Sequence, residues 1–117
     1  MVYQSVLTKL CDAVRGSQGA IMLDGGGEIV VEAGAPDDRL RLIGAYQGIA
    51  FAAVKRTAER YGTGRIESLV SRYAWGAVIL RPLNDDYYFV LAVGPEASVG
   101  LAVHRSLEAQ AVLNAEI

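Results

Sequence analysis

The chain has 117 residues, of which 52% are hydrophobic and 21% are charged, and its formal net charge is −2. This length and composition predict a single folded domain over residues 1–117 and exclude a disordered or fibrous protein. With 11 basic and 13 acidic residues, the chain lacks the excess of positive charge that is typical of proteins that bind nucleic acid or a membrane surface.

Cys11 is the only cysteine, so the chain cannot form an internal disulfide. The chain also opens without a charged and then apolar leader that ends in a cleavage site of small residues. We therefore expect a reduced, cytoplasmic protein.

Apolar residues recur every three or four positions over residues 3–15 and predict an amphipathic helix that ends at Gly16. Two β-rich runs follow, at residues 20–23 and 28–33, on either side of a glycine-rich segment at 24–27. This pattern predicts a β-hairpin. The glycine segment lacks the Lys and Ser/Thr of a phosphate-binding loop and precedes a strand, so we interpret it as a turn.

A long helix is predicted over residues 38–61, with Asp37 and Asp38 suited to its N-terminus and a Gly-Thr-Gly stop at 62–64. Residues 42–54 of this helix carry no charge. A surface helix of a small domain normally has one apolar stripe and one polar face, so this helix should be covered on two sides. The segment is too short for a bilayer, which needs ~20 apolar residues, and we expect protein as the second cover.

Three further strands are predicted at residues 65–72, 76–82 and 87–93, with turn residues at 84–86. The connection between the last two strands is too short for a parallel crossover, so they should pair antiparallel. Ser98 is suited to cap a closing helix that runs to Asn114. The predicted order is α-β-β-α-β-β-β-α, and the fold class is α+β with an antiparallel sheet.

Four motifs in this order and spacing resemble the roadblock / dynein light chain family over nearly the whole chain. They are Gly19-Ala20-Ile21-Met22-Leu23-Asp24-Gly25 followed by Glu28-Ile29-Val30, Gly64-Arg65-Ile66-Glu67, Asp86-Tyr87-Tyr88-Phe89-Val90-Leu91, and Ala97-Ser98-Val99-Gly100-Leu101. The resemblance implies a five-stranded antiparallel sheet with the long middle helix on one face and the terminal helices on the other.

Members of this family pair through the long helix and an adjoining edge strand, as homodimers or heterodimers. They regulate or scaffold small Ras-like GTPases, or serve as light chains of dynein. The chain is most similar to the stand-alone prokaryotic members, some of which act on a GTPase of gliding motility and cell polarity. The resemblance implies a non-enzymatic, dimeric regulator or binding partner of a small Ras-like GTPase. We expect no cofactor and no metal, because the sequence offers no recognisable set of residues to hold one.

Two other functions stay open. One is a scaffold that pairs with another roadblock paralogue or a sensory protein without affecting GTP hydrolysis. The other is a small-molecule sensor, because a mixed fold with a central sheet can hold a ligand pocket.

Small residues at Gly44, Gly48 and Ala52 recur every four positions along the long helix. They either let two helices cross closely, which we favour, or make room for strand side chains beneath. Tyr46, Tyr73 and Trp75 are candidate interface anchors, and Trp75 fits a place in the core equally well. The predicted dimer interface consists of Leu42, Gly44, Ala45, Tyr46, Gly48, Ile49, Phe51, Ala52, Ile66 and Leu69.

No catalytic or metal-binding constellation is visible in the sequence. His104 and Cys11 lack partners at a recognisable spacing, and we interpret them as a surface histidine and a core cysteine. Asp85 and Asp86 are interpreted as a turn. An arginine can stabilise charge in phosphoryl transfer on a partner, but the family resemblance supports no such role for the four candidates, which are Arg39, Arg41, Arg65 and Arg72.

Overall fold

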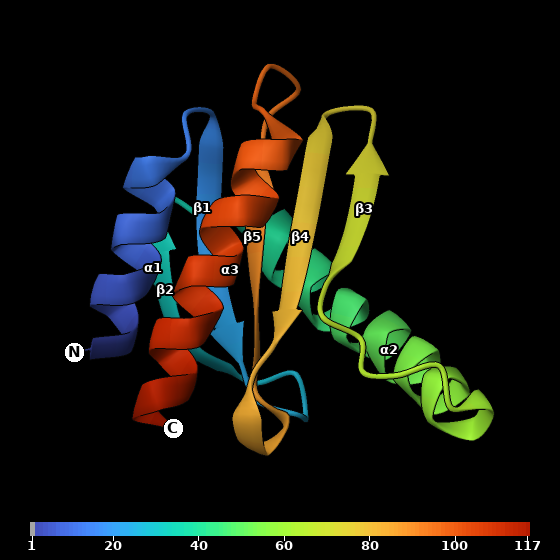
Figure 1. The fold of residues 1–117 in the computed structure, drawn as a ribbon. Helices are drawn as coiled ribbons and strands as arrows, with labels where there is room; N and C mark the ends of the chain where they lie inside the picture. Colours follow the sequence, from blue (N-terminus) through green and yellow to red (C-terminus); the bar gives the residue numbers. More distant parts are fainter. Residues whose placement is uncertain (1) are drawn as a thin grey trace.

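The computed structural model describes residues 2–117. The chain folds in the order α1 (Val2–Ala13), β1 (Ser17–Leu23), β2 (Ile29–Gly34), α2 (Asp38–Tyr61), β3 (Leu69–Tyr73), β4 (Gly76–Pro82), a short 3-10 turn η1 (Asn84–Asp86), β5 (Tyr88–Val93) and α3 (Val99–Glu116). The predicted element order and the α+β class are confirmed. Figure 1 shows α1 and α3 on the near face of the sheet and α2 on the far face.

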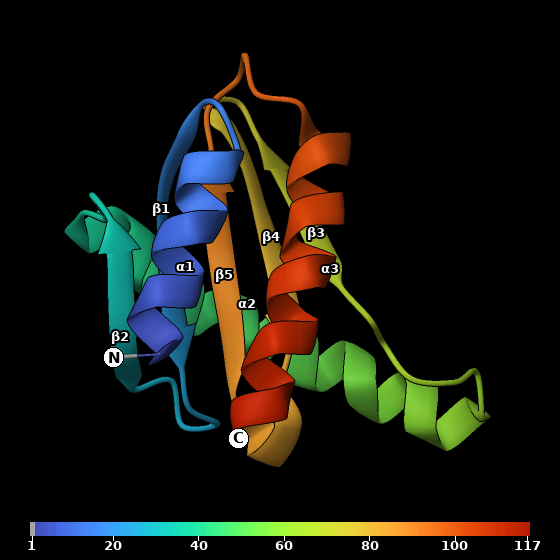
Figure 2. The ribbon, with the colours of Figure 1, turned by 60° about the vertical axis from the view of Figure 1, so that its left-hand side comes forward.

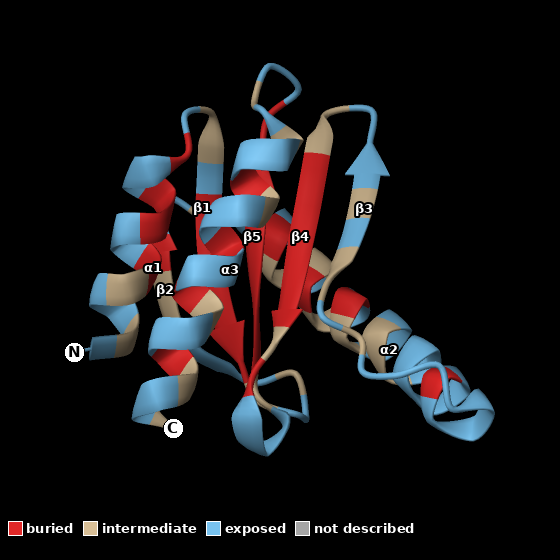
Figure 3. Ribbon diagram, in the orientation of Figure 1, coloured by how far each residue is buried: buried red, intermediate tan, exposed pale blue. Residues whose placement is uncertain are grey.

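The five strands are antiparallel and lie in the order β2-β1-β5-β4-β3, so β2 and β3 form the two edges. Side chains alternate between the two faces of a strand, and the central strands are apolar on both. Phe89 and Leu91 of β5 point into the core under α1 and α3, whereas Tyr88 and Val90 point into the core under α2. Every residue of β5 is therefore buried (Figure 3).

Helix α2 crosses the far face of the sheet and then projects beyond the β3 edge (Figures 1 and 2). Its bounds agree with the prediction because both ends have local caps. The Leu40 amide donates to the Asp37 side chain at 2.8 Å, and Gly62 takes the left-handed conformation with φ 62°. Only the first half of α2 rests on the sheet, so the projecting end is mostly exposed (Figure 3).

The third strand is shorter than predicted, and it begins at Leu69 where the sequence suggested residue 65. Residues 63–68 have no regular structure and return from the projecting end of α2 to the sheet. Pairing with β4 starts only at Leu69, opposite Leu80. The predicted start at residue 65 was wrong because the point at which the chain rejoins the sheet depends on the direction of α2. That direction is set by packing against the sheet and cannot be read from the neighbouring sequence.

Candidate protein interface

Exposed apolar side chains concentrate on α2 and β3. Among the described residues, thirteen large hydrophobic side chains are exposed, with five on α2 and two on β3: Leu42, Tyr46, Ile49, Val54 and Tyr61, then Val70 and Tyr73. Leu42, Tyr46 and Ile49 are 60%, 63% and 65% exposed. Contiguous exposed apolar surface of this kind marks an interaction site.

Five exposed residues share one side of α2 at helical spacing: Leu42, Tyr46, Ile49, Ala50 and Ala53. We call this set the α2 face. It carries no charge and no polar group except the Tyr46 hydroxyl. The sequence prediction that the helix needs a second cover is consistent with this exposure, because the chain's own sheet covers only the opposite side.

The orientation of α2 is set by contacts with β5. The Tyr88 hydroxyl donates to the carbonyl oxygen of Gly44 at 3.1 Å. A Cβ atom at Gly44 would lie 3.3 Å from Val90 Cγ2, and one at Gly48 would overlap the Tyr88 hydroxyl. Both glycines therefore face the sheet of their own chain.

This placement corrects the expected role of the small-residue stripe. Gly44 and Gly48 make room for strand side chains, so they do not provide a close crossing of two helices. Ala52 lies beside Gly48 and Tyr88 in a small surface hollow at the end of the sheet. The periodicity of the helix could not decide this, because apolar residues surround its axis.

The other predicted interface residues divide into three groups. Phe51 and Leu69 pack against the core under α2, and Ala45 is partly buried. Ile66 lines a groove between the projecting end of α2 and α3. Leu42, Tyr46 and Ile49 are the members that the structure brings together on an open surface.

A buried glutamine, which the sequence reading missed, joins α2 to β3. The side-chain nitrogen of Gln47 donates to Ser71 Oγ at 2.8 Å and to Tyr73 Oη at 2.7 Å. Tyr73 stacks on Trp75 with ring centroids 5.1 Å apart, and the Arg39 guanidinium lies 4.5 Å from the Trp75 ring centre. The sequence does contain a signal for this buried contact. Gln47 is the single amide side chain within residues 42–54, and it shares a side of the helix with Leu40 and Gly44, which are both buried.

The aromatic pair extends the α2 face towards β3. Tyr73 is partly exposed, and Trp75 is half-buried and packs against the core under α2. Trp75 therefore takes part in the core, which was one of the two interpretations of this residue from the sequence. Tyr and Trp are frequent anchors of protein interfaces, and Arg39 places a cation beside them.

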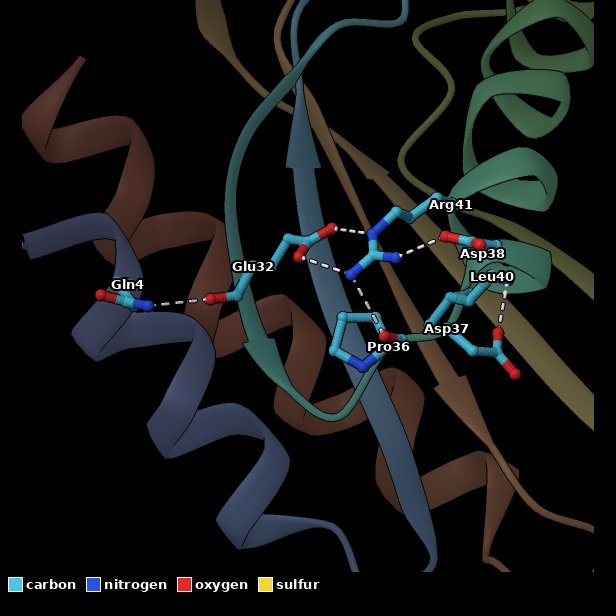
Figure 4. A network of polar contacts seen from close by, with 7 residues as sticks. All are labelled: Gln4, Glu32, Pro36, Asp37, Asp38, Leu40 and Arg41. Carbon is cyan, nitrogen blue, oxygen red and sulfur yellow. Dashed lines mark hydrogen bonds and ion pairs between the residues drawn. The ribbon is translucent and has the colours of Figure 1, made fainter.

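The β2 edge is held by polar contacts from two helices (Figure 4). The Gln4 side chain of α1 donates to the Glu32 carbonyl oxygen at 3.1 Å. The Glu32 carboxylate accepts from Arg41 Nε at 2.6 Å and from Nη2 at 3.1 Å, and Asp38 Oδ1 accepts from Nη1 at 2.7 Å. The register between β1 and β2 also shifts at Met22 and Leu23.

Arg41 is consequently engaged within its own chain. Hydrogen bonds to Glu32 and Asp38 raise the pKa of its guanidinium above the ordinary value. These bonds also fix the start of α2 to β2. Among the candidate arginines, Arg65 and Arg72 are exposed and Arg39 lies over Trp75.

A groove of about 730 Å³ lies between the projecting end of α2 and α3. Its apolar lining includes Phe51, Ile66, Leu83 and Leu107. The charged residues on its rim are exposed and of both signs: Lys55, Glu59, Arg65 and Glu67. The groove offers no convergent set of buried polar groups, so its geometry does not favour the small-molecule sensor.

The residues that were candidates for catalysis lie on the surface, in the core or in a turn. His104 is exposed on α3, and Cys11 is buried, with its thiol pKa raised to about 11 by burial and by the charge of Asp12. Asp85 and Asp86 form the η1 turn with φ 58° and 64°. The interpretations as a surface histidine, a core cysteine and a turn are confirmed.

Within residues 2–117, no group of three or more His, Cys, Asp or Glu side chains is placed to hold a metal ion. In the same part of the chain, no helix combines the length and the apolar character that are needed to cross a bilayer.

No protein-family model matches the sequence, and no curated protein sequence matches it. Solved structures do match. MglB of Myxococcus xanthus is 16% identical with a TM-score of 0.83, over 96% of this chain and 91% of that chain. A roadblock/LC7 domain from Streptomyces avermitilis is 15% identical with a TM-score of 0.78, over 94% and 93%. MglC of Myxococcus xanthus is 20% identical with a TM-score of 0.72, over 100% of both chains.

The fold is therefore that of the roadblock/LC7 domain, which confirms the resemblance seen in the sequence motifs at the level of structure. MglB and MglC are the particular proteins to which the chain is similar over nearly its whole length.

Proposed function

We propose that the chain is a non-enzymatic, dimeric regulator or binding partner of a small Ras-like GTPase. The observation that carries this proposal is the uncharged, exposed α2 face in a roadblock/LC7 fold. The family that the sequence resembles pairs through this helix and acts on such GTPases. By the same resemblance, we propose motility or cell polarity as its setting and the cytoplasm as its location.

The pairing surface consists of the α2 face and the free edge of β3. Two features support β3 over β2. The outer edge of β3 has no neighbouring strand in the described chain, and α2 projects past it (Figure 1). Strand β2, in contrast, has one carbonyl occupied by Gln4 and a shifted register, and such features disfavour the addition of another strand.

Sedimentation equilibrium at micromolar concentration tests the dimer. Tyr46→Arg should convert it to monomer, because pairing would bury two unpaired guanidinium groups. Val112→Arg is the matched control, since Val112 is 50% exposed on α3, away from the proposed surface. A wild-type chain that stays monomeric at tens of micromolar would refute the dimer.

A GTPase assay tests the functional half. The rate of GTP hydrolysis by Ras-like GTPases of the source cell is measured with and without the chain, and with the Tyr46→Arg variant. A regulator changes the rate, and the variant loses the effect. If the chain binds none of these GTPases, the proposed role as a GTPase regulator or binding partner is wrong.

The second candidate is a scaffold that pairs with another roadblock chain or a sensory protein and leaves GTP hydrolysis unchanged. This second candidate is retained because the chain is similar in structure to MglC over the full length of both chains, as well as to MglB. Binding to a GTPase without any change in its rate, together with pairing to a second roadblock chain, would support this alternative.

A further inference from the structure

We propose that the groove between α1 and α3 is a separate docking site for one amphipathic helix of a partner protein. The docked helix has apolar residues at positions i and i+4 and an acidic residue at i+7. The groove lies on the face of the sheet opposite to α2 (Figures 1 and 2), so this inference goes beyond the proposed pairing and GTPase binding. It is carried by the shape of the groove and by the order of apolar and basic residues along it.

The two helices that form the groove are antiparallel. The Tyr3 hydroxyl donates to the Glu116 carbonyl oxygen at 3.4 Å, so the start of α1 lies beside the end of α3. The groove between them has a volume of about 860 Å³. Because α1 has 12 residues, the groove is ~18 Å long, which matches about three turns of a docked helix.

The lining of the groove is apolar at its floor and at one end. Leu10 and Ala109 line it and are buried, while Val2 and Val112 are 51% and 50% exposed. Covering these two valines would remove apolar surface from water, which favours binding.

The walls of the groove determine the kind of segment that fits. An α-helix satisfies its backbone groups internally, so α1 and α3 offer no free edge to which a strand could be added. A docked segment must therefore satisfy its own backbone hydrogen bonds while it buries apolar side chains. An amphipathic helix does both, as in other complexes in which a helix lies in a groove.

Two basic residues stand at the same height along the groove. Lys9 follows Val2 by seven positions on α1, and Arg105 precedes Val112 by seven positions on α3. Seven residues are about two turns, so each basic residue shares a helix side with its valine. Because the helices are antiparallel, both valines lie towards one end of the groove and both cations lie about two turns away. This distance sets the spacing from i to i+7 in the docked helix.

The charges around the groove favour an acidic residue at this position. Glu108 also lines the groove, but its carboxylate already accepts from Arg105 Nη1 at 2.8 Å. Lys9 has no ion pair within residues 2–117. The next charges along α1, Asp12 and Arg15, are of opposite sign. The lining thus keeps one positive charge in excess, which an acidic side chain would complement.

The same cations set the direction of the docked helix. The C-terminal end of a helix carries a negative partial charge and is stabilised by nearby cations. The docked helix should therefore point its C-terminal end towards Lys9 and Arg105 and its N-terminal end towards Val2 and Val112. It then runs parallel to α1, with its acidic residue C-terminal to its apolar residues.

The size of the groove predicts weak binding. A strip ~18 Å long and ~10 Å wide covers on the order of 180 Å², whereas a stable interface buries ~800 Å² on each partner. We expect a dissociation constant of roughly 0.1–1 mM for an isolated helix.

Designed peptides test the site by NMR titration of the full chain. Three alanine-rich peptides of ~18 residues share one composition. The first has Leu at i and i+4 and Glu at i+7, the second has Glu at i and Leu at i+3 and i+7, and the third spreads these residues around the helix. The first should shift the amide signals of α1 and α3, and the other two should bind about fivefold or more weakly.

Three variants of the chain test the residues. Lys9→Glu should weaken binding of the first peptide about three- to fivefold, and it should bind the same peptide with Lys at i+7 more tightly than wild type does. Val112→Arg should weaken binding about fivefold or more, because it places a charge under the leucines. Arg56→Glu is the control for Lys9→Glu, since it makes the same charge change at an exposed position of α2, and it should have no effect.

The outcomes separate this inference from the proposed function, because no GTPase enters the experiment. Equal binding of the three peptides, shifts confined to α2, or no binding at several millimolar peptide would overturn the docking site and leave the proposed dimer and GTPase binding intact. A wild-type chain that forms assemblies larger than a dimer, which Val112→Arg dissolves, would show that a second copy fills the groove. That result would overturn the partner helix.

Discussion

The hydroxyl of Tyr88 donates a hydrogen bond to the carbonyl oxygen of Gly44 at 3.1 Å and so joins the centre of the sheet to the middle of α2. The phenol ring fills the space in front of Gly48, where any Cβ atom would collide with it. This contact fixes which side of α2 turns to the sheet and, as a result, which side is left exposed.

Gly48→Ala should destabilise the fold, although alanine is the better helix former. Overpacking costs about 1–3 kcal/mol, and the gain in helix propensity is about 1 kcal/mol. With loss of the Tyr88 hydrogen bond added, we expect a net loss of about 2 kcal/mol, measured by urea denaturation at fixed protein concentration.

Gly100→Ala is the matched control, because the only atom near its added Cβ is Ser98 Oγ at 4.0 Å. This variant should be unchanged or more stable by up to about 1 kcal/mol. Equal stability of Gly48→Ala and wild type would contradict the packing of Tyr88 against α2.

Gln47→Leu should loosen β3. The change removes the partner that Ser71 Oγ and Tyr73 Oη share. Because both contacts are only partly buried, we expect a cost of about 1 kcal/mol, the low end of the cost of an unsatisfied buried polar group. Amide hydrogen exchange over Leu69–Tyr73 should become faster, while exchange over β1 follows only the global loss of stability.

A double-mutant cycle checks the cause. In a Tyr73→Phe background, the cost of Gln47→Leu should be smaller, since one hydroxyl no longer needs a partner. Strict additivity of the two changes would show that the amide and the phenol are not coupled.

Arg81→Met should release the segment before β3. Arg81 is 4% exposed, and its guanidinium donates to Ser106 Oγ, the Glu67 carbonyl oxygen and the Val103 carbonyl oxygen at 2.9, 3.1 and 2.8 Å. Burial lowers the pKa of this guanidinium, because the charged form is desolvated. We expect a loss of roughly 1–3 kcal/mol and faster hydrogen exchange over residues 63–68.

Arg105→Met is the control for this change. Arg105 is an exposed arginine on α3, paired with Glu108 at 2.8 Å, and a surface pair of this kind is worth less than about 1 kcal/mol. Unchanged exchange of residues 63–68 in Arg81→Met would rule out the linking role of Arg81.

Cys11 should make stability fall as the pH rises above 9. The folded thiol has a pKa raised to about 11 by burial and by Asp12, against an ordinary value of 9.0. Between these values the unfolded chain releases the thiol proton and the folded chain keeps it, so rising pH favours unfolding. Cys11→Ala should flatten this slope in urea titrations between pH 8.5 and 9.5. Burial raises the pKa of the Tyr88 phenol too, so Tyr88 adds a slope of the same sign only at higher pH, where the phenol of the unfolded chain begins to ionise.

Alkylation gives a second readout for the same thiol. The native protein should react far more slowly at pH 8 than the urea-unfolded chain, because thiolate is the reactive form and is scarce in the fold. Comparable rates for the two states would mean that the thiol is accessible and not protected by the core.

Sequence patterns predicted the elements whose causes are local. The bounds of α2 follow from Asp37 and Gly62, which cap the helix through neighbouring atoms, and the hairpin turn follows from Asp24, whose carboxylate accepts from the Gly26 and Glu28 amides at 3.0 Å. The turn at Asp85 and Asp86 is local as well. The family motifs added the layer order, which the structure confirms.

The candidate site was predicted only in part, because its decisive contacts are distant in sequence. Gly44 and Gly48 are oriented by Tyr88, about forty positions later, and the apolar helix gave no periodicity from which to read that side. The role of Gln47 could not be predicted, because its partners Ser71 and Tyr73 lie on a strand 24 and 26 positions later whose start is not set by local sequence. Leu42, Tyr46 and Ile49, three of the predicted interface residues, are exposed on α2, and their part in pairing stays a prediction.

The difference between the two sheet edges limits how far an assembly of this chain can grow. The β2 edge has a carbonyl occupied by Gln4, a shifted register and the Glu32–Arg41 pair, while the outer edge of β3 has no neighbouring strand within residues 2–117. A sheet that lengthens through β3 alone presents a β2 edge at both of its ends after one addition. If copies pair through β3, the features of the two β2 ends disfavour the addition of a further strand, and they disfavour growth into a fibre by strand pairing as well.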